Sequence, residues 1–211
     1  MKQIYDDLWQ TAPEHPFMGV TSHAYLFTQK EGNILFYNSG KIEFDKVASL
    51  GGISCQYLSH RDEAGNSLAS IKQHFASKVY CHELEAASIK RYTTIDGLFD
   101  KRETRFGRVE IIPTPGHTDG SVCFFVHSPF GKKYLFTGDT IYVENGVWES
   151  RINRGDGGSK KDIIESLRLL GELTPDVVIS SASVGDTAFK EIALGEWRII
   201  TNNVIKGLSQ F

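Results

Sequence analysis

The chain has 211 residues, of which 40% are hydrophobic and 23% charged, with a formal net charge of −3. This is the balance of an ordinary globular protein, and the length suits one domain spanning residues 1–211. The net charge gives no indication of nucleic-acid or anionic-membrane binding. No apolar run is long enough to span a bilayer.

The N-terminal segment and the cysteines indicate a reducing compartment. Residues 1–10 are polar and include Asp6 and Asp7, so they do not resemble a secretory signal. The three cysteines, Cys55, Cys81 and Cys123, are odd in number and show no CxxC spacing. We expect free thiols in a cytoplasmic protein.

The first half of the chain alternates short apolar runs with helical patterns. The runs at 25–27 and 34–37 flank a turn with the sequence Lys-Glu-Gly-Asn, which predicts a hairpin. The spacing of apolar residues also predicts helices over 44–50 and 67–75, and strands over 53–59 and 78–81. A helix rich in Glu and Ala should follow the last of these strands.

The second half continues in the same manner. Apolar runs predict strands over 109–113, 121–127, 133–137 and 177–180. Ser159 is placed to cap a helix with Asp162 at the third position, and Gly171 should end that helix. A last helix is expected from Phe189 to about Leu208.

Together these elements predict an α+β fold. Tight hairpins argue against a purely parallel sheet. Two mixed β-sheets packed face to face, with helices on the outside, would bury the apolar faces of all these elements.

Three of the predicted strands end in side chains suited to metal binding. His60 and Asp62 follow one strand, His117 follows another in the stretch T-P-G-H-T, and Asp139 follows a third in F-T-G-D-T. Imidazole and carboxylate are ligands of borderline divalent metals such as zinc. A strand fixes the backbone of each residue, and the turn after the strand orients its side chain.

The order and wording of these stretches resemble the metallo-β-lactamase fold superfamily, particularly its glyoxalase II-like hydrolases. The stretches that carry the resemblance are SHAYL at 22–26, TPGHTDGSV at 114–122 and LFTGDT at 135–140. The resemblance covers nearly the whole chain. It implies a four-layer αβ/βα sandwich with the site at one edge of the two sheets.

The chain departs from the metal-binding signature of that superfamily, H-x-H-x-D-H-x-G. In a register anchored on Gly65, Leu58 replaces the first histidine and Glu63 replaces the last. In a register anchored on the preceding strand, His60 is the first histidine, Asp62 takes the second position, and two residues are missing. The sequence leaves both registers open, and both direct His60 and Asp62 towards the site.

A further departure concerns the last histidine of the superfamily, which is replaced here by Ala182. The remaining candidate ligands are His60, Asp62, His117 and Asp139, with Glu63 and His23 as further candidates. This set predicts one divalent ion, namely zinc, iron or manganese, rather than two.

Three functions are consistent with such a site. The first is a single-metal hydrolase of an ester, thioester or lactone, in which Asp62 orients the attacking water or moves its proton. The second is a mononuclear iron oxygenase or redox enzyme that uses His60, His117 and Asp139 as a facial triad. The third is a non-catalytic protein that keeps the fold and has lost the metal. The partners expected are a small-molecule substrate and a second copy of the chain, since two-fold dimers are the commonest soluble oligomers.

Overall fold

The computed structural model describes residues 1–185 and 188–210. Its strands are β1 (Lys2–Tyr5), β2 (Leu8–Gln10), β3 (Val20–Ser22), β4 (Tyr25–Phe27), β5 (Ile34–Phe36), β6 (Cys55–Tyr57), β7 (Lys78–His82), β8 (Gly97–Phe99), β9 (Glu103–Arg105), β10 (Val109–Pro113), β11 (Val122–His127), β12 (Lys133–Gly138), β13 (Tyr142–Glu144), β14 (Val147–Glu149), β15 (Val177–Ser180), β16 (Ala182–Val184) and β17 (Phe189–Glu191). Its helices are α1 (Phe44–Ser49), α2 (Ser67–Phe75), α3 (Ala86–Ile89), α4 (Lys160–Leu170) and α5 (Glu196–Ser209), and its 3-10 turns are η1 (Arg61–Glu63), η2 (Glu83–Glu85) and η3 (Arg154–Asp156).

Two large mixed sheets form the centre of the molecule, which confirms the predicted fold class. One sheet has the strand order β1-β2-β4-β5-β6-β7-β8, and the other has the order β17-β15-β12-β11-β10-β9. The first is antiparallel from β1 to β5 and parallel from β5 to β8. The second is antiparallel except for the parallel pair β12 and β15.

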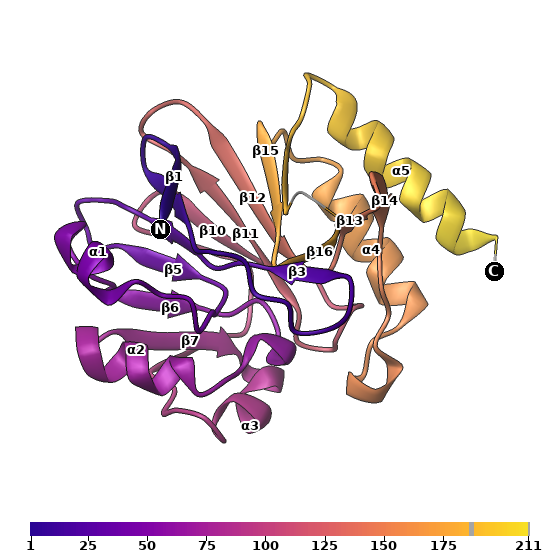
Figure 1. Ribbon diagram of the computed structural model, residues 1–211. Coiled ribbons are helices and arrows are strands. Elements are labelled where there is room, and N and C mark those ends of the chain that lie inside the picture. Colours follow the sequence, from indigo (N-terminus) through magenta and orange to yellow (C-terminus); the bar gives the residue numbers. More distant parts are fainter. Residues whose placement is uncertain (186–187, 211) are drawn as a thin grey trace.

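The two sheets and their helices form four layers. Aromatic side chains fill the space between the sheets, with Phe36 stacked on Phe136 at a centroid distance of 4.1 Å. Helices α1, α2 and α3 lie on the side of the first sheet, and α4 and α5 lie on the side of the second (Figure 1). The indole of Trp197 on α5 is buried, donates a hydrogen bond to the Leu170 carbonyl at 2.9 Å and packs against Trp148. Both tryptophans therefore pack within this chain.

Most of the predicted elements are present with small shifts at their ends. The predicted hairpin is formed by β4 and β5, and α2 has the predicted bounds. Ser159 caps α4 as expected, because its hydroxyl accepts a hydrogen bond from the Asp162 amide at 3.1 Å. The three cysteines are buried and free. Among the described residues, no helix is both long and apolar enough to cross a bilayer.

The prediction of one helix from Phe189 to Leu208 is wrong at its start. Residues Phe189–Glu191 form β17, which pairs with β15 and completes the edge of the second sheet. The helix begins only after Gly195, whose φ of 80° interrupts any continuous helix. A small third sheet, β14-β13-β16-β3, was not expected either. Its strands have three residues each, which is too short for a periodic pattern to show.

Strand direction brings the loops that carry the candidate metal ligands to one edge of the sandwich. Strands β5 and β6 are parallel, so residues after Phe36 and after Tyr57 emerge at the same edge of the first sheet. In the second sheet β10, β12 and β15 all run the same way, because β11 is antiparallel to both β10 and β12. Residues after Pro113, Gly138 and Ser180 therefore emerge together.

Close packing at Gly116 gives a testable prediction for this edge. An added Cβ at Gly116 would collide with the backbone of Ile163 on α4, and the φ of 143° is unfavourable for any other residue. We expect Gly116→Ala to lower the free energy of unfolding by about 3 kcal/mol, from strain and overpacking together. Gly107→Ala is the control, because Gly107 has a φ of 67° and no atom near its Cβ position. It should cost about 1 kcal/mol in urea unfolding. Equal costs for the two variants would contradict the packing argument.

Candidate metal centre

His60 and Asp62 lie on the short segment that links β6 to α2. His60 lies three residues after the end of β6 at Tyr57, in extended conformation, and is the N-cap residue of the turn η1. Its imidazole is buried, with only 2% of the side chain exposed. Asp62 lies within η1, and 48% of its side chain is exposed. The turn therefore places a buried imidazole beside a carboxylate that reaches solvent.

His117 is held rigidly by the turn that follows β10. The turn is closed by a hydrogen bond from the Gly116 amide to the Thr118 carbonyl at 2.9 Å. The Nδ1 atom of His117 lies 2.9 Å from the Arg151 carbonyl oxygen, which can only accept, so Nδ1 carries the proton. The lone pair of a neutral ring is then on Nε2. This atom is buried and makes no hydrogen bond with any described residue.

Asp139 is positioned through the residue before it. The amide of Gly138 donates to the Tyr37 hydroxyl at 2.9 Å, and that hydroxyl donates to the Ile179 carbonyl at 2.7 Å. Tyr37 thus ties together the ends of β5, β12 and β15. A hydrogen bond from the Ser181 hydroxyl fixes one oxygen of the Asp139 carboxylate. The other oxygen, Oδ2, faces the two histidines.

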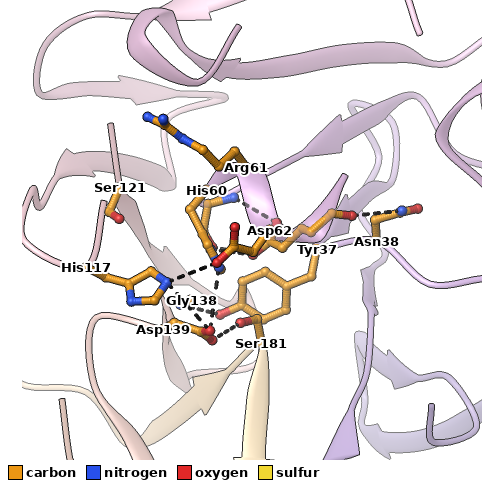
Figure 2. A network of polar contacts seen from close by, with 12 residues as sticks. Tyr37, Asn38, His60, Arg61, Asp62, His117, Ser121, Gly138, Asp139 and Ser181 are labelled. Carbon is orange, nitrogen blue, oxygen red and sulfur yellow. Dashed lines mark hydrogen bonds and ion pairs between the residues drawn. The ribbon is translucent and has the colours of Figure 1, made fainter. Parts of the chain in front are cut away.

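The four side chains meet at one point (Figure 2). Nε2 of His60 lies 3.6 Å from Oδ2 of Asp139, and Nε2 of His117 lies 3.8 Å from the same oxygen. Nε2 of His117 is also 3.5 Å from Oδ2 of Asp62. The ligand atoms of His60, Asp62 and His117 all lie within 4.8 Å of one another. Ligands about 2.0–2.2 Å from a common ion are at most about 4.3 Å apart, so slight side-chain rotation suffices for coordination.

The imidazoles and carboxylates of the site shift one another's pKa values. Burial opposes ionisation of Asp139, but the charges of His60 and His117 and the hydrogen bond from His60 outweigh it and hold the pKa of Asp139 well below its usual range. Burial likewise opposes protonation of His60, but Asp139 and Glu63 outweigh it and raise its pKa. Interaction with His117 lowers the pKa of Asp62. The site therefore concentrates negative charge on its carboxylates, and in the absence of a metal a proton on His60 balances part of it.

The structure places the two further candidates, Glu63 and His23, away from this point. The Glu63 carboxylate lies on the other side of His60, where it accepts hydrogen bonds from the Ser59 amide and hydroxyl. His23 lines the same cavity, but its Nδ1 atom is 2.9 Å from the Thr11 carbonyl oxygen, and burial lowers its pKa. Ala182 stands on the cavity wall and offers no ligand atom. Among the described residues, one group of at least three potential ligands was found.

The four side chains lie in a cavity of about 1190 Å³. The loop between β2 and β3 contributes Phe17 and Met18, which are 74% and 103% exposed. Arg151 and Arg154 line the cavity as well. The cavity thus offers both an apolar surface and cationic groups to a bound molecule.

Arg61 adjoins the site, but its guanidinium points away from the place where the four side chains meet (Figure 2). It forms ion pairs with Glu85, Asp119 and Asp156, the last at 3.3 Å. Glu85 is completely buried. Because Arg61 adjoins Asp62 and Asp119 lies two residues after His117, these ion pairs fix the loops of Asp62 and His117 relative to each other.

Several of these supporting residues were not found by reasoning from the sequence. Tyr37 contacts Gly138, which is 101 residues away in the chain, and no local pattern indicates such a contact. The three ion pairs of Arg61 span 24 to 95 residues. The cavity loop of Phe17 and Met18 lacks periodicity, although two adjacent large apolar residues in a loop are a signal that could have been used.

Comparisons with known proteins show which family and which fold the chain is similar to. A family model described as the metallo-beta-lactamase superfamily matches residues 57–182. A hydroxyacylglutathione hydrolase of Salmonella dublin is 29% identical over 123 residues, covering 58% of this chain and 44% of that protein. A probable hydroxyacylglutathione hydrolase of Schizosaccharomyces pombe is 38% identical over 97 residues, covering 43% of this chain and 35% of that protein. The chain spans less than half the length of these curated relatives.

Solved structures show the same fold. A metallo-beta-lactamase from Pontibacter korlensis superposes with a TM-score of 0.71 at 19% identity, covering 100% of this chain and 98% of that chain. A mutant metallo-beta-lactamase from Cronobacter sakazakii gives a TM-score of 0.68 at 16% identity, covering 95% of this chain and 96% of that chain. The similarity therefore extends over the whole fold, beyond the matched segment.

The ion pairs of Arg61 give a prediction about stability. Replacing Arg61 with Leu leaves the Glu85 carboxylate buried without its cation, which typically costs 3–5 kcal/mol. We expect a fall in Tm of roughly 6–12 °C for about 3 kcal/mol. Arg198→Leu is the control, since Arg198 and Glu172 are both exposed and such a pair contributes about 1 kcal/mol or less. A Tm for Arg61→Leu equal to that of the control would show that the ion pairs do not stabilise the site.

Proposed function

Since the chain belongs to the metallo-beta-lactamase superfamily, we propose that it is a hydrolase with a single divalent metal ion, held by His60, Asp62, His117 and Asp139. The proposed substrate is a carboxylic ester, thioester or lactone. This class agrees with the names of the hydroxyacylglutathione hydrolases to which the chain is similar.

The observation that carries the proposal is the buried Nε2 atom of His117, which makes no hydrogen bond with any described residue and has only carboxylate oxygens near it, at 3.5 and 3.8 Å. A buried polar atom without a partner costs free energy, and the surroundings of His117 fix its ring so that this atom faces two carboxylates. A cation at that point would satisfy Nε2 and balance the charge of both carboxylates. Without a metal, Nε2 would have only the longer carboxylate contacts at 3.5 and 3.8 Å, and this favours a metal site over a protein that has lost its metal.

The ligand arrangement also favours one of the two sequence registers. In the register anchored on the strand, His60 and Asp62 are the first two ligands of one ion, and they lie beside His117 as that register requires. A second ion would need further ligands. The position of the last histidine of the superfamily is held by Ala182, which has no ligand atom, and the Glu63 carboxylate is turned towards Ser59.

A divalent ion bound here would polarise the substrate carbonyl and lower the pKa of water. Positioning of the attacking water would fall to the side chains around the ion. The two histidines are almost enclosed and 24% of the Asp139 side chain is exposed, whereas 48% of the Asp62 side chain is exposed, so the Asp62 carboxylate is the most accessible of the four to water in the cavity. Its lowered pKa keeps it ionised near neutral pH, which suits it to orienting a water molecule more than to accepting a proton.

The cavity supports a substrate with an apolar portion. Phe17 and Met18 expose large apolar surfaces at the cavity, and methionine adapts to varied shapes. Arg151 and Arg154 would accept an anionic group elsewhere on the same molecule. These features suit a substrate that carries both an acyl chain and a charged group.

Iron chemistry is the alternative that uses the same side chains. Two histidines and a carboxylate form the facial triad of mononuclear iron enzymes. Metal analysis distinguishes the oxygenase from the hydrolase. Bound iron together with oxygen consumption would support an oxygenase, and bound zinc together with ester cleavage would support the hydrolase.

Replacing Asp139 with Asn tests the metal site. The change keeps the shape and removes one negative charge that faces both imidazoles. We expect the wild-type protein, purified without chelator, to contain about one metal ion per chain, and the variant to contain far less. Esterase activity should fall by more than about 100-fold, beyond the effect of losing a supporting group alone. Asp100→Asn, at an exposed carboxylate outside the cavity, should change neither value. Unchanged metal content in the Asp139 variant would remove Asp139 from the ligand set.

Replacing Phe17 with Ser tests the apolar surface. For an ester with a long acyl chain we expect KM to rise about tenfold, because a lost apolar contact of this size is worth about 1–3 kcal/mol. For an acetate ester of the same alcohol KM should stay the same. Phe130→Ser is the control, since Phe130 is similarly exposed but outside the cavity. Equal changes in KM for both esters would mean that Phe17 does not contact the acyl chain.

A further inference from the structure

Glu63 is a buried carboxylate next to the proposed metal ligands, yet it faces away from the point where they meet. Only 5% of its side chain is exposed. Its Oε2 atom accepts a hydrogen bond from the Ser59 amide at 3.0 Å, and its Oε1 atom accepts one from the Ser59 hydroxyl. Oε1 also lies 3.3 Å from Nδ1 of His60. To bind a metal with His60 and His117, Glu63 would have to give up all three contacts.

These contacts determine which nitrogen of His60 carries a proton. The Ser59 hydroxyl has one proton, and it donates that proton to Glu63. The same hydroxyl oxygen lies 2.9 Å from Nδ1 of His60, so in this contact it can only accept. Nδ1 must therefore be protonated and donate to Ser59. The lone pair of a neutral His60 ring is then on Nε2, the atom 3.6 Å from Asp139.

The two histidines are thus oriented by different partners. His117 donates from Nδ1 to a neutral backbone carbonyl, that of Arg151. His60 donates from Nδ1 to a hydroxyl that is itself bound to a carboxylate. A carboxylate behind a ligating imidazole fixes the ring and makes the ligand nitrogen more basic.

We propose that Glu63 is a positioning residue, which acts through Ser59 to hold His60 with Nε2 directed at the metal. The proposal deepens the proposed function and rests on it, because it requires His60 to be a metal ligand. Glu63 itself contacts neither metal nor substrate.

The test compares Zn²⁺ affinity among variants, measured by competition with a chromogenic chelator at neutral pH. We expect Glu63→Gln to weaken Zn²⁺ binding by about 10–100-fold, the usual cost of losing the group behind a ligand. Ser59→Ala should weaken binding less, because it keeps a carboxylate 3.3 Å from Nδ1. Glu144→Gln is the matched control. Glu144 lines the same cavity but accepts a hydrogen bond from Tyr142, so its replacement should leave the affinity within about twofold.

A second measurement needs no variant at Glu63 and so does not depend on how that variant folds. Long-range ¹H–¹⁵N NMR of the zinc-loaded wild-type protein, with His60 identified by a His60→Asn variant, reports which ring nitrogen carries the proton. We expect Nδ1 of His60 to be protonated and Nε2 to show the shift of a metal-bound nitrogen. Because zinc on Nε2 by itself leaves the proton on Nδ1, the signal that reports on Glu63 is the ¹H shift of the Nδ1 proton. We expect it further downfield for His60, whose acceptor is bound to a carboxylate, than for His117, whose acceptor is a backbone carbonyl, and equal shifts would contradict the role of Glu63.

The outcomes separate the proposal from the function on which it rests. Wild-type protein that binds no Zn²⁺ overturns the proposed function and this inference with it. Wild-type protein that binds one Zn²⁺, with Glu63→Gln equal to the Glu144 control, overturns the role of Glu63 and leaves the function standing. Coordination through Nδ1 of His60 in the NMR spectrum overturns that role as well.

Discussion

Two imidazoles and two carboxylates are confined to one small volume at the edge of the sandwich, and the rest of the structure depends on this concentration of charge. Asp139 and Glu63 raise the pKa of His60, and the buried Nε2 atom of His117 makes no hydrogen bond with any described residue but lies 3.5 and 3.8 Å from two carboxylate oxygens. A single divalent ion would balance the carboxylates and give that nitrogen a partner. The supporting contacts of Tyr37, Arg61 and Ser181 hold the four groups together against their mutual repulsion and desolvation.

The fold explains how residues so far apart in the sequence meet. Parallel neighbours within each sheet bring their strand ends to one edge, and the aromatic core between the sheets fixes the two edges relative to each other. The turns after these strands then orient the individual side chains. A turn closed between Gly116 and Thr118 presents His117, and the three-residue turn after His60 presents Asp62.

Much of this could be predicted from the sequence, because its signals are local. Apolar runs marked most strands of the two large sheets, and a serine with an aspartate three residues later marked the start of α4. The turns carrying His60, His117 and Asp139 could be recognised because residues of types suited to metal binding follow apolar strands. What the sequence did not reveal depends on distant contacts. The partners of Tyr37 and Arg61, and the direction of Glu63, are decided by backbone groups and side chains that only the folded chain brings close. The strand β17 was mistaken for helix because pairing with β15 overrides a weak local preference.

The most direct test of the account is a crystal structure of the protein grown with Zn²⁺, with anomalous diffraction recorded at the zinc edge. The account predicts one strong peak per chain, about 2.0–2.2 Å from Nε2 of both His60 and His117 and from a carboxylate oxygen of Asp62 or Asp139. Two peaks of similar height beside Asp139 would contradict the single-metal site. So would the absence of any peak, with the two imidazoles hydrogen-bonded to protein groups instead.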